Sequence, residues 1–467
     1  MSNSTDSLSA SRMGTAPVAP LLLSLAIPMM ISMLVQALYN VVDSIFVSRI
    51  GEDALSAVSL AFPVQNLMIA FAVGTAVGVN ALLSKCLGEQ NQKEADRTAM
   101  NGLFLAVCSG AVFLLFGVFG VKSFMFSQTG DAAIRQYGID YLSVCCTFGM
   151  GMFIQCMFEK ILVSTGRTSI AMVTQLIGAI TNIILDPIFI FGLLGAPKMG
   201  AAGAAIATVL GQCLGAVSGL IANLALNKDV NFSFRAFRPS LRSIRKIYSV
   251  GIPSIGMNAI GSVMTLALNG ILISFSSTAV AVFGVYFKLQ SFVFMPIFGL
   301  NNGLIPIVGY NFGARKPQRI VDVVKIACVY AIGIMAIGLA LAQFAPGLLL
   351  GLFDASPDML AIGTVALRTI SWSFLLAGFN VIASACLQAL GHGMLALWAS
   401  VVRQLVVLIP AAWLLSLTGS LDAIWWSFPI AELAALVMCA LAIRHCYRKI
   451  ITPMLAEQPQ AQPAATI

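Results

Sequence analysis

Four polar side chains interrupt an otherwise apolar stretch near the start of the chain. In "LVQALYNVVDSIFV" (34–47), Gln36, Tyr39, Asn40 and Asp43 follow one another at helical spacing. On a helix they form one polar stripe, which must face protein or water rather than lipid. An ionisable group within an apolar helix is costly to bury, so Asp43 is a candidate functional residue.

A second stretch, "TNIILDPIFIF" (181–191), combines an amide, a carboxylate and a proline. Asn182 and Asp186 share one face of a helix, and Pro187, which lacks an N–H, leaves the carbonyl oxygen of Ile183 without its helical partner. Two carboxylates, an amide and a free carbonyl suit a proton or a small hard cation, since both prefer oxygen ligands. The alternative is that each Asp is a buried acid hydrogen-bonded by neighbouring amides and hydroxyls.

The composition identifies the environment of these residues. The chain has 467 residues, of which 59% are hydrophobic and 9% charged, with a mean hydropathy of +0.94. Apolar stretches of about 20 residues recur along it, each long enough to cross a hydrocarbon layer of about 30 Å. In lipid they must be helical, because every backbone group needs an internal partner. We therefore predict an all-α polytopic membrane protein.

Twelve spans are predicted, with both termini on one side of the membrane. Most Lys and Arg residues fall on that side, which the positive-inside rule assigns to the cytoplasm. The formal charge of +8 therefore reflects topology, and we expect no nucleic-acid binding. The predicted spans are 20–48, 55–83, 97–121, 136–162, 168–193, 200–226, 244–274, 279–309, 319–344, 358–389, 393–418 and 421–446.

The chain contains an internal repeat. When "LAIP" (25–28) is aligned with "VGIP" (250–253), Gln65 meets Gln290 at the same offset, and several glycines also coincide. Parallel repeats of this kind are typical of transporters that carry substrate between their halves. The glycine pairs are Gly74 with Gly299, Gly78 with Gly303, Gly88 with Gly313 and Gly166 with Gly391. The predicted parts are an N-terminal tail (1–19), an N-lobe (20–226), a linker (227–243), a C-lobe (244–446) and a C-terminal tail (447–467).

The two acids are expected at a similar depth in the membrane. At 1.5 Å per residue, Asp43 lies about 7–8 Å below the outer end of its span, and Asp186 lies at a similar depth. Glu159 and Lys160 near the cytoplasmic end of the fourth span are either a solvated pair or cavity residues. Lys288 lies well inside the eighth span, where Glu432 of the twelfth is a candidate partner. Our candidates for a substrate cavity are Gln36, Tyr39, Asn66, Glu159 and Lys288.

Longer motifs carry a family resemblance. "YNVVDSIFVSRIGEDALSAVSLAFP" (39–63), the glycines of the second span and "LGEQNQKEA" (87–95) resemble the multidrug and toxic compound extrusion (MATE) family. "FVFMPIFGLNNGLIPIVGYNFGARK" (292–316) is similar to its MepA-like bacterial branch. The resemblance covers about residues 18–448. It implies a V-shaped pair of six-helix lobes in the bacterial plasma membrane that exchange a cation for an organic, often cationic, drug.

The resemblance also implies roles for particular residues. In one set of members an N-lobe acidic site uses an Asp, an Asn, a second Asp and a Thr, and these roles fall on Asp43, Asn182, Asp186 and Thr208. Pro28 occupies the family's bend in the first span and is the expected hinge. Other members place acids in the C-lobe. In this chain the corresponding span 244–274 offers only Asn258 and Asn269, and the span 358–389 has no acid beyond its first turn. Coupling is therefore expected in the N-lobe.

We expect secondary active efflux by cation antiport, with H⁺ favoured over Na⁺ as the coupling ion. A Na⁺ ion would use Asp43, Asn182 and Asp186. Small organic cations and membrane lipids are the expected partners of a monomer. No nucleophile–base set or Cys/His cluster is present, so we expect neither an enzyme nor a cofactor or structural metal. The alternatives are a lipid-linked oligosaccharide flippase of the same superfamily and a passive channel.

Overall fold

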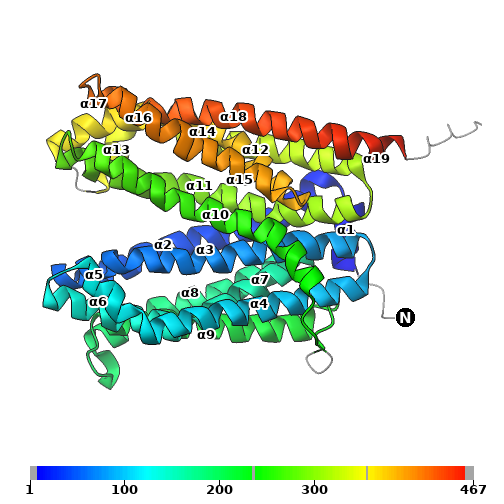
Figure 1. Ribbon diagram of the computed structural model, residues 1–467, viewed down its shortest axis with the longest axis horizontal. Coiled ribbons are helices and arrows are strands. Elements are labelled where there is room, and N and C mark those ends of the chain that lie inside the picture. The colour runs from blue at the N-terminus through cyan, green and yellow to red at the C-terminus, as the bar shows by residue number, and fades with distance from the viewer. Residues whose placement is uncertain (1–7, 234–236, 354–355, 458–467) are drawn as a thin grey trace, which may run out of the picture.

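The computed structural model describes residues 8–233, 237–353 and 356–457; within these ranges the chain is mainly helical and contains no strand (Figure 1). The first seven and last ten residues of the predicted tails lie outside the described residues. The first half comprises α1 (Leu8–Thr15), α2 (Val18–Ser48), α3 (Glu52–Gly88), α4 (Gln92–Phe119), α5 (Val121–Gln128), α6 (Ala132–Thr147), α7 (Met150–Ser164), α8 (Thr168–Phe191), the 3₁₀ turn η1 (Leu193–Gly195) and α9 (Ala201–Leu226).

The second half contains twelve further helical segments. The π-helices η2 and η3 continue the helices that precede them without a break. The segments are α10 (Leu241–Leu272), α11 (Ser277–Gly313), α12 (Pro317–Phe344), α13 (Pro346–Gly351), α14 (Pro357–Ala389), α15 (Gly393–Val401), η2 (Val402–Leu408), α16 (Ile409–Ser416), α17 (Leu421–Ile424), α18 (Ser427–Cys446), η3 (Tyr447–Ile451) and α19 (Thr452–Ala456).

The described residues form eleven helices that are long and apolar enough to cross a membrane, and twelve spans when a bent pair is included. That pair is α6 and α7, which meet at an angle of 46°. The fourth span, predicted as one helix over 136–162, is therefore broken at Phe148 and Gly149. Met68 packs closely against Gly149, where a Cβ atom would overlap its methyl group. Apolar composition alone gave no sign of this bend.

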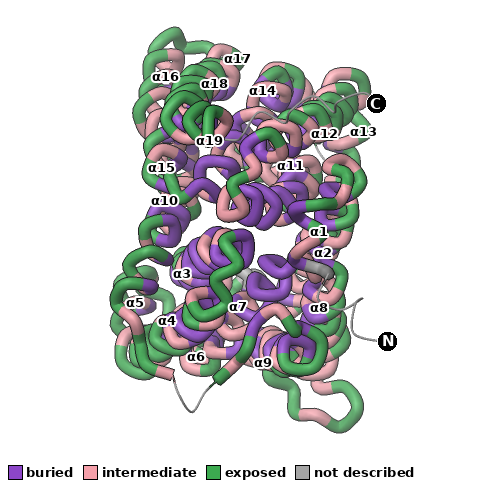
Figure 2. The backbone as a smooth tube through the Cα atoms, turned by 90° about the vertical axis from the view of Figure 1, so that its right-hand side faces the viewer, coloured by how far each residue is buried: buried purple, intermediate pink, exposed green. Residues whose placement is uncertain are grey.

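The helices form two bundles, which we call the N-lobe (α2–α9) and the C-lobe (α10–α18) (Figure 1). The lobes contact each other mainly through α2 against α11 and α3 against α10. We call the end of the molecule that carries α1 and α19 the terminal end. Seen from that end, buried backbone is concentrated where the two bundles meet (Figure 2).

Glycines of the repeat allow the lobes to touch at the terminal end. A Cβ atom on Gly88 would overlap the backbone oxygen of Tyr310, and one on Gly313 would overlap that of Lys85. Tyr310 is the repeat equivalent of Lys85, just as Gly313 is that of Gly88, so the two repeats make equivalent contacts. The same duplication relates Gly74 against Ile255 to Gly299 against Met30, and Gly78 against Gly251 to Gly303 against Ala26.

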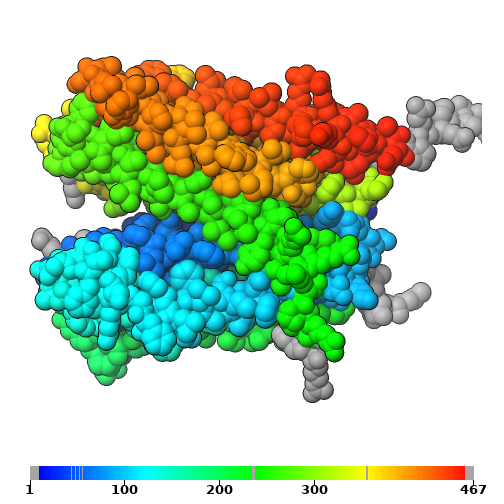
Figure 3. Space-filling model, viewed as in Figure 1, coloured from blue at the N-terminus to red at the C-terminus, as the bar shows by residue number. Residues whose placement is uncertain are grey.

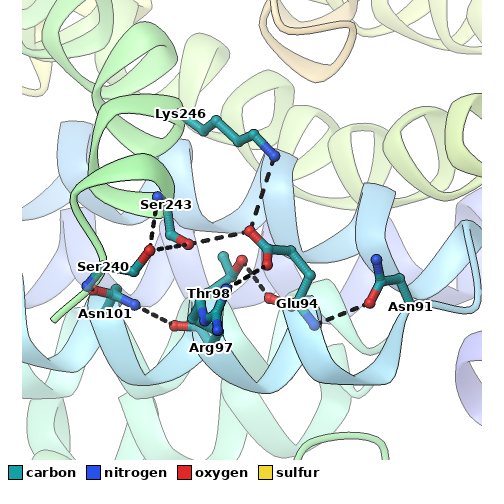
Figure 4. Close-up of polar contacts among 8 residues, drawn as sticks. All are labelled: Asn91, Glu94, Arg97, Thr98, Asn101, Ser240, Ser243 and Lys246. Atoms are coloured by element: carbon teal, nitrogen blue, oxygen red, sulfur yellow. Dashed lines mark hydrogen bonds and ion pairs between the residues drawn. The ribbon is translucent and has the colours of Figure 1, made fainter. Parts of the chain in front are cut away.

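Polar contacts also join the lobes at this end. Ser243 of α10 donates to Glu94 of α4 over 3.1 Å, and Lys246 Nζ lies 3.9 Å from the same carboxylate (Figure 4). The backbone N–H of Ser240 donates to Asn101 over 2.9 Å. The beginning of the C-lobe is thus hydrogen-bonded to the N-lobe.

The short helix α1 spans the same junction. Its last carbonyl groups accept hydrogen bonds from the C-lobe: Arg319 Nη2 donates to the oxygens of Met13 and Ala16, and Lys316 Nζ donates to that of Gly14. Cations suit a helix C-terminus, where carbonyl groups lack intrahelical partners. The N-terminal segment therefore connects α2 of the N-lobe to the base of α12.

The opposite end of the molecule is open. The space-filling view shows a cleft between the lobes there, while the terminal end is closed (Figure 3). Pro28 lies inside α2, which continues past it as one helix to Ser48. The hinge predicted at Pro28 is thus a position with a missing backbone hydrogen bond in an otherwise continuous helix.

We predict that Gly313→Ala destabilises the closed terminal end. Its Cβ would overlap the backbone oxygen of Lys85, so the lobes must separate locally. Gly284→Ala in the same helix is the matched control, because nothing lies within 4 Å of its Cβ position. Gly313→Ala should lower the melting temperature of the purified protein and lengthen spin-label distances between α3 and α11. Equal behaviour of the two variants would contradict the role of this contact.

Candidate functional site

A cavity of about 590 Å³ lies between the lobes and is lined by both of them. Its apolar wall includes flexible or aromatic side chains such as Met33, Met257 and Phe298, which accommodate ligands of varied shape. Its polar wall comprises Gln36, Tyr39, Asn40, Gln155, Glu159, Lys160, Gln175, Asn182, Thr208, Gln212, Asn258, Asn301, Asn302, Asn380, Gln388, Arg403 and Gln404, among others.

A cluster of oxygen-bearing side chains adjoins the N-lobe wall. The Asn182 amide contacts both Asp186 and Thr208. With its nitrogen toward Asp186, it donates to Oδ2 over 3.1 Å, while its oxygen accepts from the Thr208 hydroxyl over 3.0 Å. Asp186 is fully buried. α8 supplies Asn182 and Asp186 one turn apart, and the closely packed α9 supplies Thr208.

Asp43 of α2 completes this cluster. Its carboxyl group lies close enough to that of Asp186 for the two groups to interact. Among the described residues, its Oδ1 is buried without a hydrogen-bond partner. Both acids lie about 7–8 Å from the end of their helix, as the sequence predicted. The structure therefore brings Asp43, Asn182, Asp186 and Thr208 together.

Tyr39 and Gln36 lie on the same stripe of α2 and reach the cavity. Tyr39 lines its wall and is close enough to Asp43 and Asp186 to interact with both carboxyl groups. Gln36 accepts a hydrogen bond from Gln175 over 2.7 Å, which joins α2 to α8. The polar stripe therefore extends from the acid cluster along the cavity wall.

Glu159 and Lys160 of α7 are buried at the cavity rather than solvated. Their exposed fractions are 7% and 5%, and Lys160 Nζ lies 3.7 Å from Glu159 Oε1. The ammonium group donates to Asn302 of α11 over 2.7 Å. This bond crosses between the lobes, and the sequence gave no indication that Asn302 takes part. The charge of Glu159 is thus only loosely paired.

A separate charged cluster lies in the C-lobe. Arg403 donates to Glu432 over 2.7 Å, and Asn380 donates to the other carboxylate oxygen over 2.7 Å. Arg403 is the second residue of the π-helical segment η2, and its side chain lines the cavity. Such segments are frequent at functional sites. The partner of Glu432 is therefore Arg403, and the pairing suggested for Lys288 is wrong.

Two of the candidate cavity residues lie elsewhere. Asn66 of α3 donates to Ser262 of α10 and joins the lobes outside the cavity. Lys288 is exposed, and its Nζ lies 5.9 Å from the ring centre of Phe353. The structure therefore places Gln36, Tyr39 and Glu159 on the cavity wall, but not Asn66 or Lys288. Lys288 is amphipathic and can pack its stem on an aromatic ring while its charge remains accessible.

A duplicated helical membrane protein with a polar cavity between its lobes has the architecture of a secondary transporter. The family model MatE matches residues 28–188 and 253–414, and the chain belongs to this family. The second match begins at Pro253, the residue that the repeat pairs with Pro28.

Individual relatives are distant but nearly full-length. The chain is 27% identical over 436 residues to the multidrug export protein MepA of Staphylococcus aureus strain MSSA476, which covers 91% of this chain and 93% of that protein. A MATE family transporter of the MOP superfamily in an outward-facing conformation superposes with a TM-score of 0.89 at 27% identity, covering 95% of this chain and 98% of that one. A MOP superfamily transporter from Pyrococcus furiosus Vc1, described as having a binding pocket of reverse polarity, gives the same TM-score and identity and covers 96% and 98%.

We predict that Arg403→Gln destabilises the C-lobe by about 2 kcal/mol, because Glu432 loses a charge-assisted hydrogen bond in a largely buried site. Adding Glu432→Gln should recover most of that loss, since the unpaired carboxylate is then removed. Thermal unfolding of the single and double variants measures both effects. A double variant no more stable than Arg403→Gln would argue against the pair.

Proposed function

We propose that this protein is a cation-coupled multidrug exporter that binds its coupling cation in the N-lobe. The observation that carries the proposal is the proximity of the Asp43 and Asp186 carboxyl groups beside a cavity between duplicated lobes. The related MepA proteins are named multidrug export proteins, which supports the same function for this chain. The substrates are amphipathic organic compounds, often cationic.

The electrostatics of the acid pair support a bound cation. Two carboxylates close together repel each other strongly where water is scarce, and no Lys or Arg of the described residues is ion-paired with either. One proton shared between the acids, or one Na⁺ ion among their oxygens, removes that repulsion. The amide of Asn182 and the hydroxyl of Thr208 supply further polar contacts. We favour H⁺, because one proton shared between the two carboxylates is enough to remove most of their mutual repulsion.

Transport would proceed by alternating access. The described conformation is closed at the terminal end and open at the other, which we assign to the cytoplasm and the outside respectively because basic residues gather at the terminal end. Cation uptake from outside would rearrange α2 about Pro28 and expel the drug. Separation of the glycine contacts at the terminal end would then open the cavity to the cytoplasm. One charge moving through 100 mV supplies about 2.3 kcal/mol.

The charges of the cavity favour an exporter of drugs over a flippase of lipid-linked oligosaccharides. A flippase for anionic pyrophosphate carriers calls for a cavity dominated by free cations. Here Lys160 lies beside Glu159, and Arg403 is paired with Glu432. Lys288, the other cation considered, does not line the cavity.

We predict that Asp43→Asn and Asp186→Asn each abolish coupled efflux. Proteoliposomes containing the purified protein would receive a pH gradient or a sodium gradient separately, and efflux of a fluorescent cation would be recorded. The wild-type protein should respond to the pH gradient, and each variant should fall to the level of empty liposomes. Asp140→Asn is the control, because that exposed carboxylate accepts only a local bond from Gln136. Intact coupling in Asp43→Asn would refute the assignment.

We also predict that Glu159→Gln weakens binding of a monocationic substrate about tenfold, which corresponds to about 1.4 kcal/mol. The loss follows because Glu159 is the loosely paired acid on the cavity wall. An uncharged analogue of the same size should bind the variant and the wild type alike. Fluorescence titration measures both affinities, and equal losses for the two ligands would mean that Glu159 shapes the cavity without recognising charge.

A further inference from the structure

The outward face of α18 changes from aliphatic to basic within one helical turn. Leu433, Val437 and Leu441 follow one another at helical spacing and are 55%, 53% and 57% exposed. Continuing at the same spacing toward the terminal end, this face carries Arg444 with His445 and then Arg448 with Lys449. α18 lies on the outside of the C-lobe, where its atoms form part of the molecular surface (Figure 3).

The basic side chains surround a hollow. Leu441, Arg444, His445, Arg448 and Lys449 line an open depression of about 410 Å³. It lies where α18 passes into the π-helix η3, whose wider turn is closed by a hydrogen bond from the Thr452 hydroxyl to the Tyr447 oxygen over 3.1 Å. We call this depression the α18 groove. It is separate from the cavity between the lobes.

The charge of the α18 groove is not neutralised by the described part of the protein. None of its four basic side chains has an ion pair or a hydrogen bond to another described residue, and residues 458–467 contain no Asp or Glu. Other basic residues at this end are engaged: Arg319 binds carbonyl groups of α1, and Arg315 is paired with Glu457. The groove therefore presents concentrated positive charge next to an apolar stripe.

We propose that the α18 groove binds the phosphate headgroup of an anionic membrane phospholipid, with an acyl chain along Leu441, Val437 and Leu433. The apolar stripe is continuous with the basic groove, so a ligand that fills both must be a lipid with a negative headgroup. A soluble anion would use only the basic part. Within the α18 groove, each Lys or Arg that faces the bound headgroup should strengthen its binding about fivefold, the effect of one basic residue at an anionic membrane surface, whereas a basic residue outside the groove should add much less to retention of that lipid.

The test compares two triple variants of the full-length protein in nanodiscs that contain mainly zwitterionic lipid and a minor share of phosphatidylglycerol. Arg444→Gln with Arg448→Gln and Lys449→Gln removes three charges from the groove. Arg238→Gln with Arg242→Gln and Arg245→Gln removes three exposed charges elsewhere at the same end. Retained phosphatidylglycerol is measured by native mass spectrometry, and thermal unfolding confirms that both variants fold.

The groove variant should retain phosphatidylglycerol about a hundredfold more weakly, while the control stays within about fivefold of the wild type. Equal losses in the two variants would overturn the proposal, because the attraction would then depend on net charge alone. An excess of inorganic phosphate should leave the bound lipid in place. Displacement by phosphate would also overturn it, since the site would then recognise a soluble anion without its acyl chain.

Discussion

The close contact of the two lobes at the terminal end is the constraint on which the rest of the structure depends. α3 and α11 reach the backbone of the facing lobe only because Gly88 and Gly313 carry no side chain there. The contact is made twice, once by each repeat, so it holds both sides of the junction at the same separation. With that end closed, the lobes diverge toward the other end, and the cavity lies between them.

The cost of burying polar groups in lipid explains why the functional side chains gather between the lobes. On α2 the exposed residues at helical spacing include Leu34, Leu38 and Ile45, whereas Gln36 and Tyr39 point to the cavity. A helix with these two faces has one stable orientation in a membrane, because each polar group needs a partner and lipid offers none. The same requirement fixes α8, whose Asn182 and Asp186 are buried against α9.

Much of the fold and part of the candidate site could be predicted from the sequence. The spans follow from apolar length, and the repeat follows from glycines that recur at one offset. Asp43 and Asp186 were placed at one depth because helix rise is constant. The pairing of Arg403 with Glu432 and Asn380 was missed because it joins three helices distant in sequence, and a π-helical segment near Arg403 changes the helical register. Likewise, Asn66 and Lys288 were assigned by residue type, which does not report the direction a side chain takes.

The buried acids of the two lobes have different partners, and this difference is relevant to where a coupling cation would bind. Glu432 in the C-lobe has an internal cationic partner, because Arg403 donates to it over 2.7 Å. The repeat equivalent of Asp43 in the C-lobe is Leu268, which is buried and apolar. The N-lobe acids have no such built-in cation among the described residues, and in our proposal a cation from solution compensates their charge. A cation that enters and leaves can couple to a gradient, whereas a tethered arginine cannot, which favours the N-lobe as the site of coupling.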